Sequence, residues 1–85
     1  MKLTVSMPER EAAKAEATRM AVALRLRAVE RTARVDVIGP APAYVARRAG
    51  RWRWHVVLRG ADPVAILDGS VPAPWSVDVD PESLL

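Results

Sequence analysis

Four arginines fall within seven residues of the 85-residue chain, and they are the side chains best suited to ligand chemistry: Arg47, Arg48, Arg51 and Arg53. A guanidinium keeps its charge at physiological pH and forms paired hydrogen bonds with phosphate oxygens. Contacts to phosphates carry charge but no base information, so binding should be weak and similar for unrelated sequences. We therefore predict that these four side chains contact the phosphates of a nucleic acid rather than its bases.

The remaining residue types exclude most enzyme chemistry. The chain has no cysteine and one histidine, His55, so a disulfide or thiolate zinc site is impossible and a catalytic metal site is not expected. The sequence contains no Gly-rich phosphate loop, no GxSxG elbow and no His-x-Glu zinc motif. We predict a non-catalytic chain with no catalytic residue, metal site or cofactor, in which His55 is a surface strand residue.

The length indicates one small domain over residues 1–85. No apolar run approaches the roughly 20 residues of a membrane span, and the first residues show no signal-peptide pattern. We expect a cytoplasmic protein without membrane contact.

Charge is divided unevenly along the chain. All thirteen Lys and Arg residues lie at or before Arg59, whereas five acidic residues follow it without a basic one. The net charge of +3 therefore combines +8 for the first part with −5 for the last. This asymmetry favours a polyanionic partner, although charge pairing inside a small domain is an alternative explanation.

The arginine group leads into residues 50–59, the stretch with the clearest strand pattern. Alternation divides its side chains into an apolar set, Trp52, Trp54, Val56 and Leu58, and a second set, Arg51, Arg53, His55, Val57 and Arg59. We predict that the apolar set faces the core, because apolar sets are more often buried than exposed. In the alternative, outward Trp52 and Trp54 would be stacking platforms for single-stranded nucleic acid.

Five further elements are predicted from periodicity and turn signals. They are a strand over residues 2–7, a helix over about 9–28, a strand over 34–38, a short helix over 61–67 and a strand over 75–80. A capping box at residues 6–9 would begin the first helix, and Asp62 followed by Pro63 would begin the second.

Two of these strands have predicted limits that matter for the arginines and the core. Gly39 and Pro40 should end the second strand, because proline cannot donate a ladder hydrogen bond, and a long basic loop should then lead to Gly50. In the last strand alternation would bury one set of side chains: Trp75, Val77 and Val79.

The first helix carries two apolar stripes. One consists of Ala13, Ala17, Met20, Leu24 and Ala28, and its small alanines suit close packing on a sheet. The second stripe, roughly opposite, consists of Val22, Leu26 and Val29. Either loops half cover this second stripe, or it packs on another domain or subunit.

The order strand, helix, strand, strand, helix, strand predicts an α+β domain in the ferredoxin-like βαββαβ arrangement. Both helices should cover one face of a four-stranded antiparallel sheet whose first and third strands are central. The other face would be open and charged, with these side chains: Lys2, Thr4, Ser6, Asp36, Arg51, Arg53, His55, Ser76 and Asp78.

Three segments also resemble a known family. Residues 38–43 (IGPAPA), 50–59 (GRWRWHVVLR) and 75–81 (WSVDVDP) occur in the order found at the C-terminus of the bacterial replication-restart helicase, primosomal protein N-prime. The resemblance is specific over residues 35–85 and weak before them. It implies a domain similar to the ribosomal S10 subunit, attached to a helicase core of the same polypeptide, that helps to bind branched and single-stranded DNA during primosome assembly.

The sequence lacks other parts of that helicase. The ATP-binding and zinc-binding segments of the helicase are absent, so ATP and zinc are expected only in those missing parts. The chain is therefore predicted to be an excised domain that cannot unwind DNA. In the family the domain borders a pocket for the acidic tail of the single-stranded-DNA-binding protein, near a longer helix with basic and polar side chains. Here that helix begins Ala61-Asp62-Pro63, which argues against the tail as a partner. The competing hypothesis is a protein–protein interaction module, or a ribosomal S10-like structural module, without DNA binding of its own.

Overall fold

A computed structural model of the chain describes residues 1–48, 50–60, 63–67, 71 and 74–78, with the backbone alone for 43–48 and 64. The described residues form one α-helix, one short 3₁₀ helix and four strands. In chain order these are β1 (Lys2–Met7), α1 (Arg10–Glu30), β2 (Val35–Arg48), β3 (Arg51–Gly60), η1 (Pro63–Ile66) and β4 (Trp75–Asp78). The predicted α+β class is confirmed.

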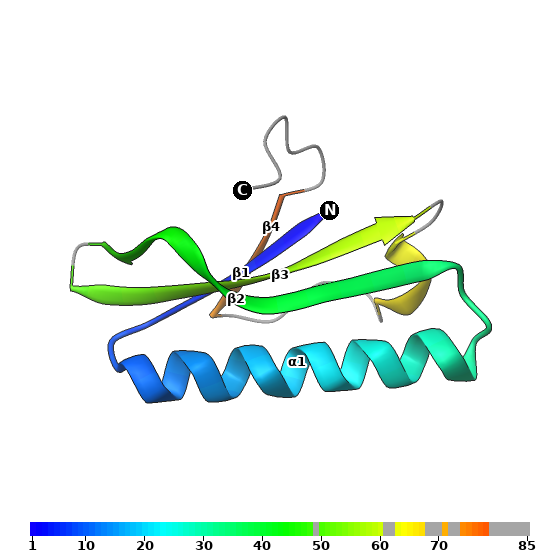
Figure 1. Cartoon of the computed structure of the whole chain (residues 1–85), viewed down its shortest axis with the longest axis horizontal. Coiled ribbons are helices and arrows are strands. Elements are labelled where there is room, and N and C mark those ends of the chain that lie inside the picture. Colours follow the sequence, from blue (N-terminus) through cyan, green and yellow to red (C-terminus); the bar gives the residue numbers. More distant parts are fainter. Residues whose placement is uncertain (49, 61–62, 68–70, 72–73, 79–85) are drawn as a thin grey trace.

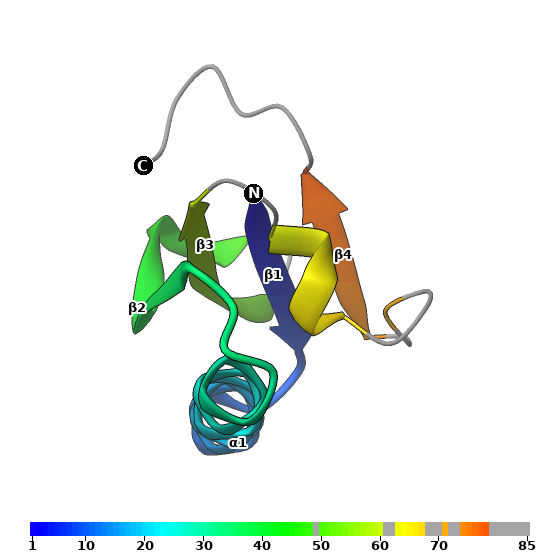
Figure 2. The same ribbon diagram turned by 90° about the vertical axis from the view of Figure 1, so that its right-hand side faces the viewer.

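The strands form one antiparallel sheet in the order β2-β3-β1-β4. The first and third strands are therefore central, as predicted. α1 runs along one face of the sheet (Figure 1), and a view along the helix shows the strands as one layer above it (Figure 2). Among the described residues no helix covers the other side of the sheet, which we call the open face.

The helix α1 forms because residues 10–30 are mostly Ala, Glu, Lys, Arg, Leu and Met, the residue types with the smallest free-energy cost in a helix. The first predicted stripe is buried as a whole: Ala13, Ala17, Met20, Leu24 and Ala28. Ala21 is buried beside it. Because an alanine side chain ends at Cβ, the helix backbone lies close to the sheet.

The start of α1 differs from the prediction. The N-cap residue is Glu9, which has an extended backbone and makes no side-chain capping bond, so the capping box at residues 6–9 is wrong. The physical reason is that β1 continues to Met7 and keeps Ser6 in the sheet, opposite Arg53 of β3. The Ser6 hydroxyl accepts a hydrogen bond from Arg51 instead of capping the helix.

The core lies between α1 and the two central strands. In the β1–β3 ladder Leu3 pairs with Val56 and Val5 with Trp54. The largest fully buried side chains are Leu3, Val5, Leu24, Val56, Leu58 and Ile66. Each such burial contributes roughly 1.5–3 kcal/mol, so this small set supplies most of the driving force for folding.

The apolar face of β3 points toward α1, as predicted. Trp54 is half-buried and packs against the core, and the Arg10 guanidinium of α1 lies 5.8 Å from the centre of a Trp52 ring. Both indoles therefore belong to the helix side of the sheet. The alternative in which they are stacking platforms on the open face is wrong.

The strand β2 is much longer than predicted. It continues through Gly39 and Pro40 to Arg48, so both the predicted end of the strand and the long basic loop after it are wrong. Its ladder with β3 shifts register twice, once before Ala41 and once after Pro42. β2 is an edge strand, and an edge strand with such irregularities tolerates prolines because their missing N–H groups need not face the ladder.

The predicted second helix is a single 3₁₀ turn, η1, rather than an α-helix over residues 61–67. Four residues are enough for i→i+3 bonds but not for a regular α-helix. From α1, Arg27 Nη1 donates to the Ile66 carbonyl at 3.3 Å and Arg31 Nη1 donates to the Ala65 carbonyl at 2.9 Å. These bonds hold η1 beside α1, while the predicted cap Asp62 lies outside the described residues.

The edge strand β4 is attached to α1 through its first residue. Trp75 is buried, and its Nε1 donates a hydrogen bond to Glu16 Oε2 at 2.8 Å. Hydrogen bonds from Arg19 and Trp75 lower the pKa of the Glu16 carboxyl. Val77 remains 38% exposed, so its predicted burial is wrong, because α1 lies under the other three strands rather than under β4. The predicted strand end at residues 79–80 lies outside the described residues.

One arginine of α1 reaches the outer edge of β2. Leu58 of β3 exchanges backbone hydrogen bonds with Met1, so the N–H and C=O groups of Leu58 point toward β1. Val37 of β2 is the ladder partner of Leu58 on the other side. The N–H and C=O groups of Val37 therefore point away from the sheet. Arg25 Nη2 donates to the Val37 carbonyl at 3.1 Å and to the Gly39 carbonyl at 2.5 Å. The guanidinium thus occupies two acceptors on the outer side of the strand.

Two glycines at the ends of β3 have positive φ, and alanine substitutions there would test how closely the backbone packs. Gly60 has a φ of 152°, and a Cβ there would lie 2.2 Å from the Arg34 carbonyl oxygen, whereas Gly50 has a φ of 76° and no atom within 4 Å of its Cβ position. Gly60→Ala should therefore lower the free energy of unfolding by about 3 kcal/mol or more, and Gly50→Ala by about 1 kcal/mol. Denaturant unfolding measures both values. Equal losses would contradict the close approach at Gly60.

Candidate nucleic-acid interface

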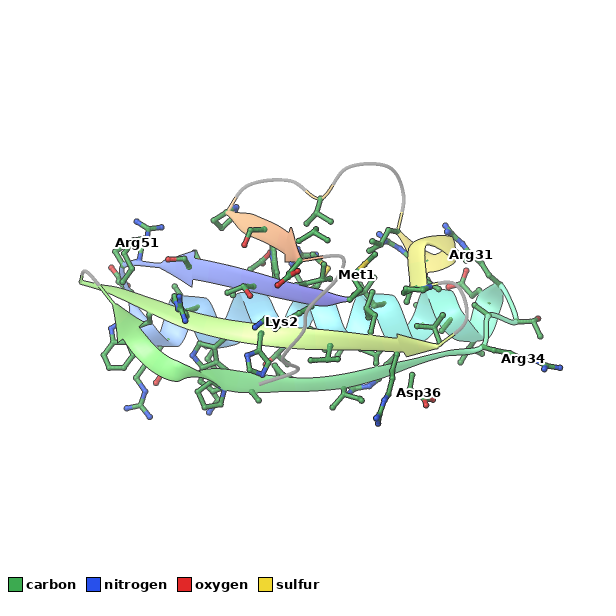
Figure 3. All side chains as sticks on the ribbon, turned by 90° about the horizontal axis from the view of Figure 1, so that it is seen from above. Met1, Lys2, Arg31, Arg34, Asp36 and Arg51 are labelled. Carbon is green, nitrogen blue, oxygen red and sulfur yellow. The ribbon has the colours of Figure 1, made fainter. Side chains whose placement is uncertain are left out.

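The four predicted arginines lie at one end of the sheet, where β2 and β3 form a hairpin. In the ladder Arg48 pairs with Arg51, and Arg47 pairs with Trp52. Figure 3 places Arg51 at this end and Arg34 at the opposite end of the molecule. Positions 47 and 48 are therefore strand positions, not parts of the predicted loop.

The ladder groups these positions in a way that the sequence spacing does not show. Directly opposed residues have Cβ atoms about 4.5–5.5 Å apart, and like charges there repel each other. Arg48 and Arg51 are such a pair. The ladder thus makes positions 48 and 51 direct neighbours, although two residues separate them in the sequence.

The side chain of Arg51 is fixed by β1 while remaining exposed. Its Nε donates to Ser6 Oγ at 3.0 Å, and its Nη2 donates to the Ser6 carbonyl at 2.6 Å. Both acceptors are uncharged, so the positive charge of the guanidinium is oriented without being neutralised.

Arg53 lies on the open face of the same strand and is half-buried. Its Nε is buried and has no hydrogen-bond partner. A buried donor without an acceptor costs about 1–3 kcal/mol, so an incoming acceptor would stabilise this side chain.

His55 is buried, with 7% of its surface exposed, so the prediction of a surface residue is wrong. It lies on the central strand β3, opposite Thr4 of β1 and Ala41 of β2, and neighbours on both sides cover it. Burial lowers the pKa of His55, and the positive charges of Lys2 and Arg53 lower it further. The imidazole is therefore held in its neutral form.

The other charges of the open face are spread over its length. Figure 3 shows Lys2 near the middle of the sheet and Asp36 toward the end away from Arg51. Arg19 and Glu16 form an ion pair on α1, and none of the described cations of the open face is part of it. Within the described part of the chain, the cations of the open face are therefore not neutralised by ion pairs.

Two residues near the arginines were not included in the predicted phosphate-contacting group. Alternation had placed Lys2 and His55 on the open face, but it could not show that the β1–β3 register puts Lys2 and Arg53 on either side of His55. A pairing between distant segments leaves no local signal in the sequence.

A second surface feature lies between the C-terminal half of α1 and β2. It is a shallow groove of about 640 Å³, lined by Arg25, Ala28, Val29, Thr32, Ala33, Arg34, Val35, Asp36 and Val37. Beside it, the second stripe of α1 is exposed: Val22 at 58%, Leu26 at 58% and Val29 at 78%. The groove and the arginine hairpin are at opposite ends of the molecule.

Neither a metal-binding cluster nor a membrane-spanning helix occurs among the described residues. Those residues contain no group of three or more acidic or histidine side chains placed to hold a metal ion. They also contain no helix with both the length and the apolar character needed to cross a membrane.

A family model for the primosomal protein N C-terminal domain matches residues 1–82 of the chain. The chain belongs to this family. The match includes the residues before position 35, where the sequence resemblance is weak, and it spans every element of the described fold. Neither the curated proteins nor the solved structures include a match to the chain.

Membership in the primosomal protein N C-terminal domain family connects the chain with replication restart. The matched family is defined by a C-terminal domain and not by a catalytic domain. The arginine hairpin and the open face are therefore features of a primosomal domain, and DNA and the replication machinery are the general class of partner that such a domain has.

His55 gives this primosomal domain a pH-dependent stability. Because its pKa is lower in the folded chain than the ordinary 6.5, the unfolded chain binds more protons between the two pKa values. The contribution of neutral His55 to the free energy of unfolding should be complete above pH 6.5. It should be lost as the pH falls from 6.5 through the pKa of His55 in the folded chain. Urea unfolding at about pH 8 and about pH 5.5 should show this loss in the wild type and a smaller one in His55→Gln. The same pH dependence in both proteins would contradict a buried neutral imidazole.

Proposed function

We propose that the chain is a non-catalytic DNA-binding and domain-docking module of a cytoplasmic replication-restart helicase, acting in primosome assembly. The observation that supports DNA binding is the cationic hairpin end, where Arg48 and Arg51 oppose each other in the ladder. A polyanion that lies across this end relieves their repulsion. DNA is the polyanion that a primosomal domain meets.

The proposed contacts are to phosphates, made by Arg47, Arg48, Arg51 and Arg53. The described open face presents no helix that could enter a major groove, and Trp52 and Trp54 lie on the helix side. A groove-reading helix and stacking aromatics are two devices for direct base readout, and this face offers neither. The module therefore binds branched or single-stranded DNA without sequence preference.

The salt dependence of binding tests this interface. If about three phosphates are neutralised, the logarithm of the affinity should fall against the logarithm of the salt concentration with a slope of about −2 to −3. The double variant Arg47→Gln, Arg48→Gln should reduce that slope by about one to two, because fewer counterions are released. Fluorescence anisotropy with forked and single-stranded DNA at several salt concentrations measures both slopes.

The matched control is Lys14→Gln with Arg34→Gln, which removes the same charge from an exposed position on α1 and from an exposed position at the opposite end of the molecule, where Figure 3 places Arg34. Its slope should equal that of the wild type. If the salt-dependence slope decreases equally in both double variants, the total charge of the domain and not the hairpin determines the salt dependence of binding. If the folded domain binds neither DNA at low salt, DNA binding by the isolated chain is wrong and docking remains.

Docking is supported by the exposed stripe of α1, Val22, Leu26 and Val29. We assign this stripe to the helicase core of the same polypeptide, where ATP and zinc would also be bound. The acidic tail of the single-stranded-DNA-binding protein is not proposed as a partner. If DNA binding fails, the same stripe supports the alternative, a protein-interaction or ribosomal S10-like structural module.

Replacing one residue of the stripe tests docking. Leu26→Lys should abolish binding of a hydrophobic dye and any self-association of the isolated domain, and it should change the melting temperature little because Leu26 is 58% exposed. Ser76→Lys, which adds the same charge at an exposed position of β4, should change neither property. Dye fluorescence and analytical ultracentrifugation give the comparison. A wild-type domain that is monomeric and binds no dye would contradict the assignment.

A further inference from the structure

Three basic side chains lie in a row along the centre of the open face: Lys2, His55 and Arg53. They come from the two central strands, where Thr4 pairs with His55 and Ser6 pairs with Arg53, and Lys2 lies two residues from Thr4 on the same face. Residues two apart in a strand are about 7 Å apart, so Lys2 and Arg53 lie on either side of His55, and their side chains are long enough to reach an anion placed over the imidazole. We call them the central cluster.

We propose that the central cluster is a phosphate-binding site that extends the arginine hairpin into the middle of the sheet. Under the proposed function the phosphate is a phosphodiester of bound DNA, and to that extent this inference rests on that function. A small free oxyanion has the same chemistry, so the two sources need separate measurements.

Arg53 supplies the first argument for an anion here. Its buried Nε lacks an acceptor, although the rest of the side chain is only half-buried. A small rotation of the side chain toward an anion gives this donor a charge-assisted hydrogen bond, which is roughly twice as strong as one between neutral groups. The anion therefore satisfies a group that the free protein leaves unsatisfied.

Charge balance supplies the second argument. The groups that face His55 are Thr4 on β1, Ala41 on β2, and Arg53 and Val57 on β3, while Lys2 acts from β1. None of these is acidic. The nearest described carboxylate by register is Asp78 of β4, which pairs with Lys2 across the ladder but forms no ion pair with it. α1 packs on the opposite face of the sheet (Figure 2).

The imidazole supplies the third argument and a means of detection. Burial and the two cations lower the pKa of His55, so an anion beside them opposes the second cause and raises it. By linkage, the anion then binds more tightly when His55 is protonated. A fall in pH through the titration of His55 should strengthen DNA binding by about threefold or more, since each pKa unit corresponds to a factor of ten. Phosphodiesters keep a constant charge in this range.

The experiment uses the single histidine of the chain as an NMR probe. The imidazole C–H signals of His55 are titrated with pH in the free domain, with an oligothymidylate, and with sulfate against chloride at matched ionic strength. The oligothymidylate should raise the pKa of His55, and its affinity should rise as the pH falls. Sulfate, a tetrahedral anion of constant charge, tests whether the cluster accepts the same chemistry from a free ion.

Two variants assign the effect to the cluster. Lys2→Gln and Arg53→Gln should each abolish most of the ligand-induced rise in the pKa of His55. Both substitutions also change the pKa of His55 in the free domain, so the rise is measured from the free value of each variant. Lys14→Gln with Arg34→Gln should retain the rise. Of these variants Lys2→Gln is the milder change, so it preserves the test if Arg53→Gln fails to fold.

The outcomes separate this inference from the proposed function. Oligothymidylate that binds by anisotropy without moving the pKa of His55 overturns the central cluster and leaves the hairpin interface in place. Sulfate that raises the pKa in a domain that does not bind DNA supports the anion site and overturns the proposed function. No rise with either ligand overturns the inference.

Discussion

The close approach of α1 to the sheet is the constraint on which the other features depend. Ala13, Ala17 and Ala21 have no exposed surface, so the helix backbone lies where larger side chains would not fit. A helix of 21 residues is about 31 Å long, against 38 Å for the longest dimension of the molecule. One helix therefore covers most of the length of the sheet. The core needs no second layer, and the opposite face stays available for charged side chains.

This arrangement gives the two long surfaces of the domain different chemistry. The strands turn their apolar side chains toward α1, so the basic residues of β3 can only lie on the open face or at the hairpin. α1 in turn presents its second stripe on the side away from the sheet. A nucleic acid on the sheet and a neighbouring domain on the helix would not compete for the same residues. Under the proposed function, the module would hold both at once.

Features set by local periodicity could be predicted from the sequence, and features set by pairing between distant segments could not. Alternation in β3 and the stripe from Ala13 to Ala28 were correct because each depends on its own spacing. The end predicted at Gly39 was wrong because only the position of β2 at the edge of the sheet lets it continue through prolines. The burial of His55 escaped prediction because neighbours from β1 and β2 cover it. The arginines Arg48 and Arg51 were expected to act together, but only the ladder shows that they are directly opposed.

The contact of Arg25 with the outer carbonyls of β2 has a consequence for self-association. The outer edge of an antiparallel sheet is a template for further strands, and long exposed edges cause aggregation and strand exchange between molecules. Arg25 places a charged group over the acceptors of Val37 and Gly39, so an approaching strand would have to displace it and leave its charge beside the new pairing. At Val37 and Gly39 the edge of β2 is therefore less available for strand addition. Under the proposed function, this contact would also hinder neighbouring copies on one nucleic acid from pairing through this part of β2.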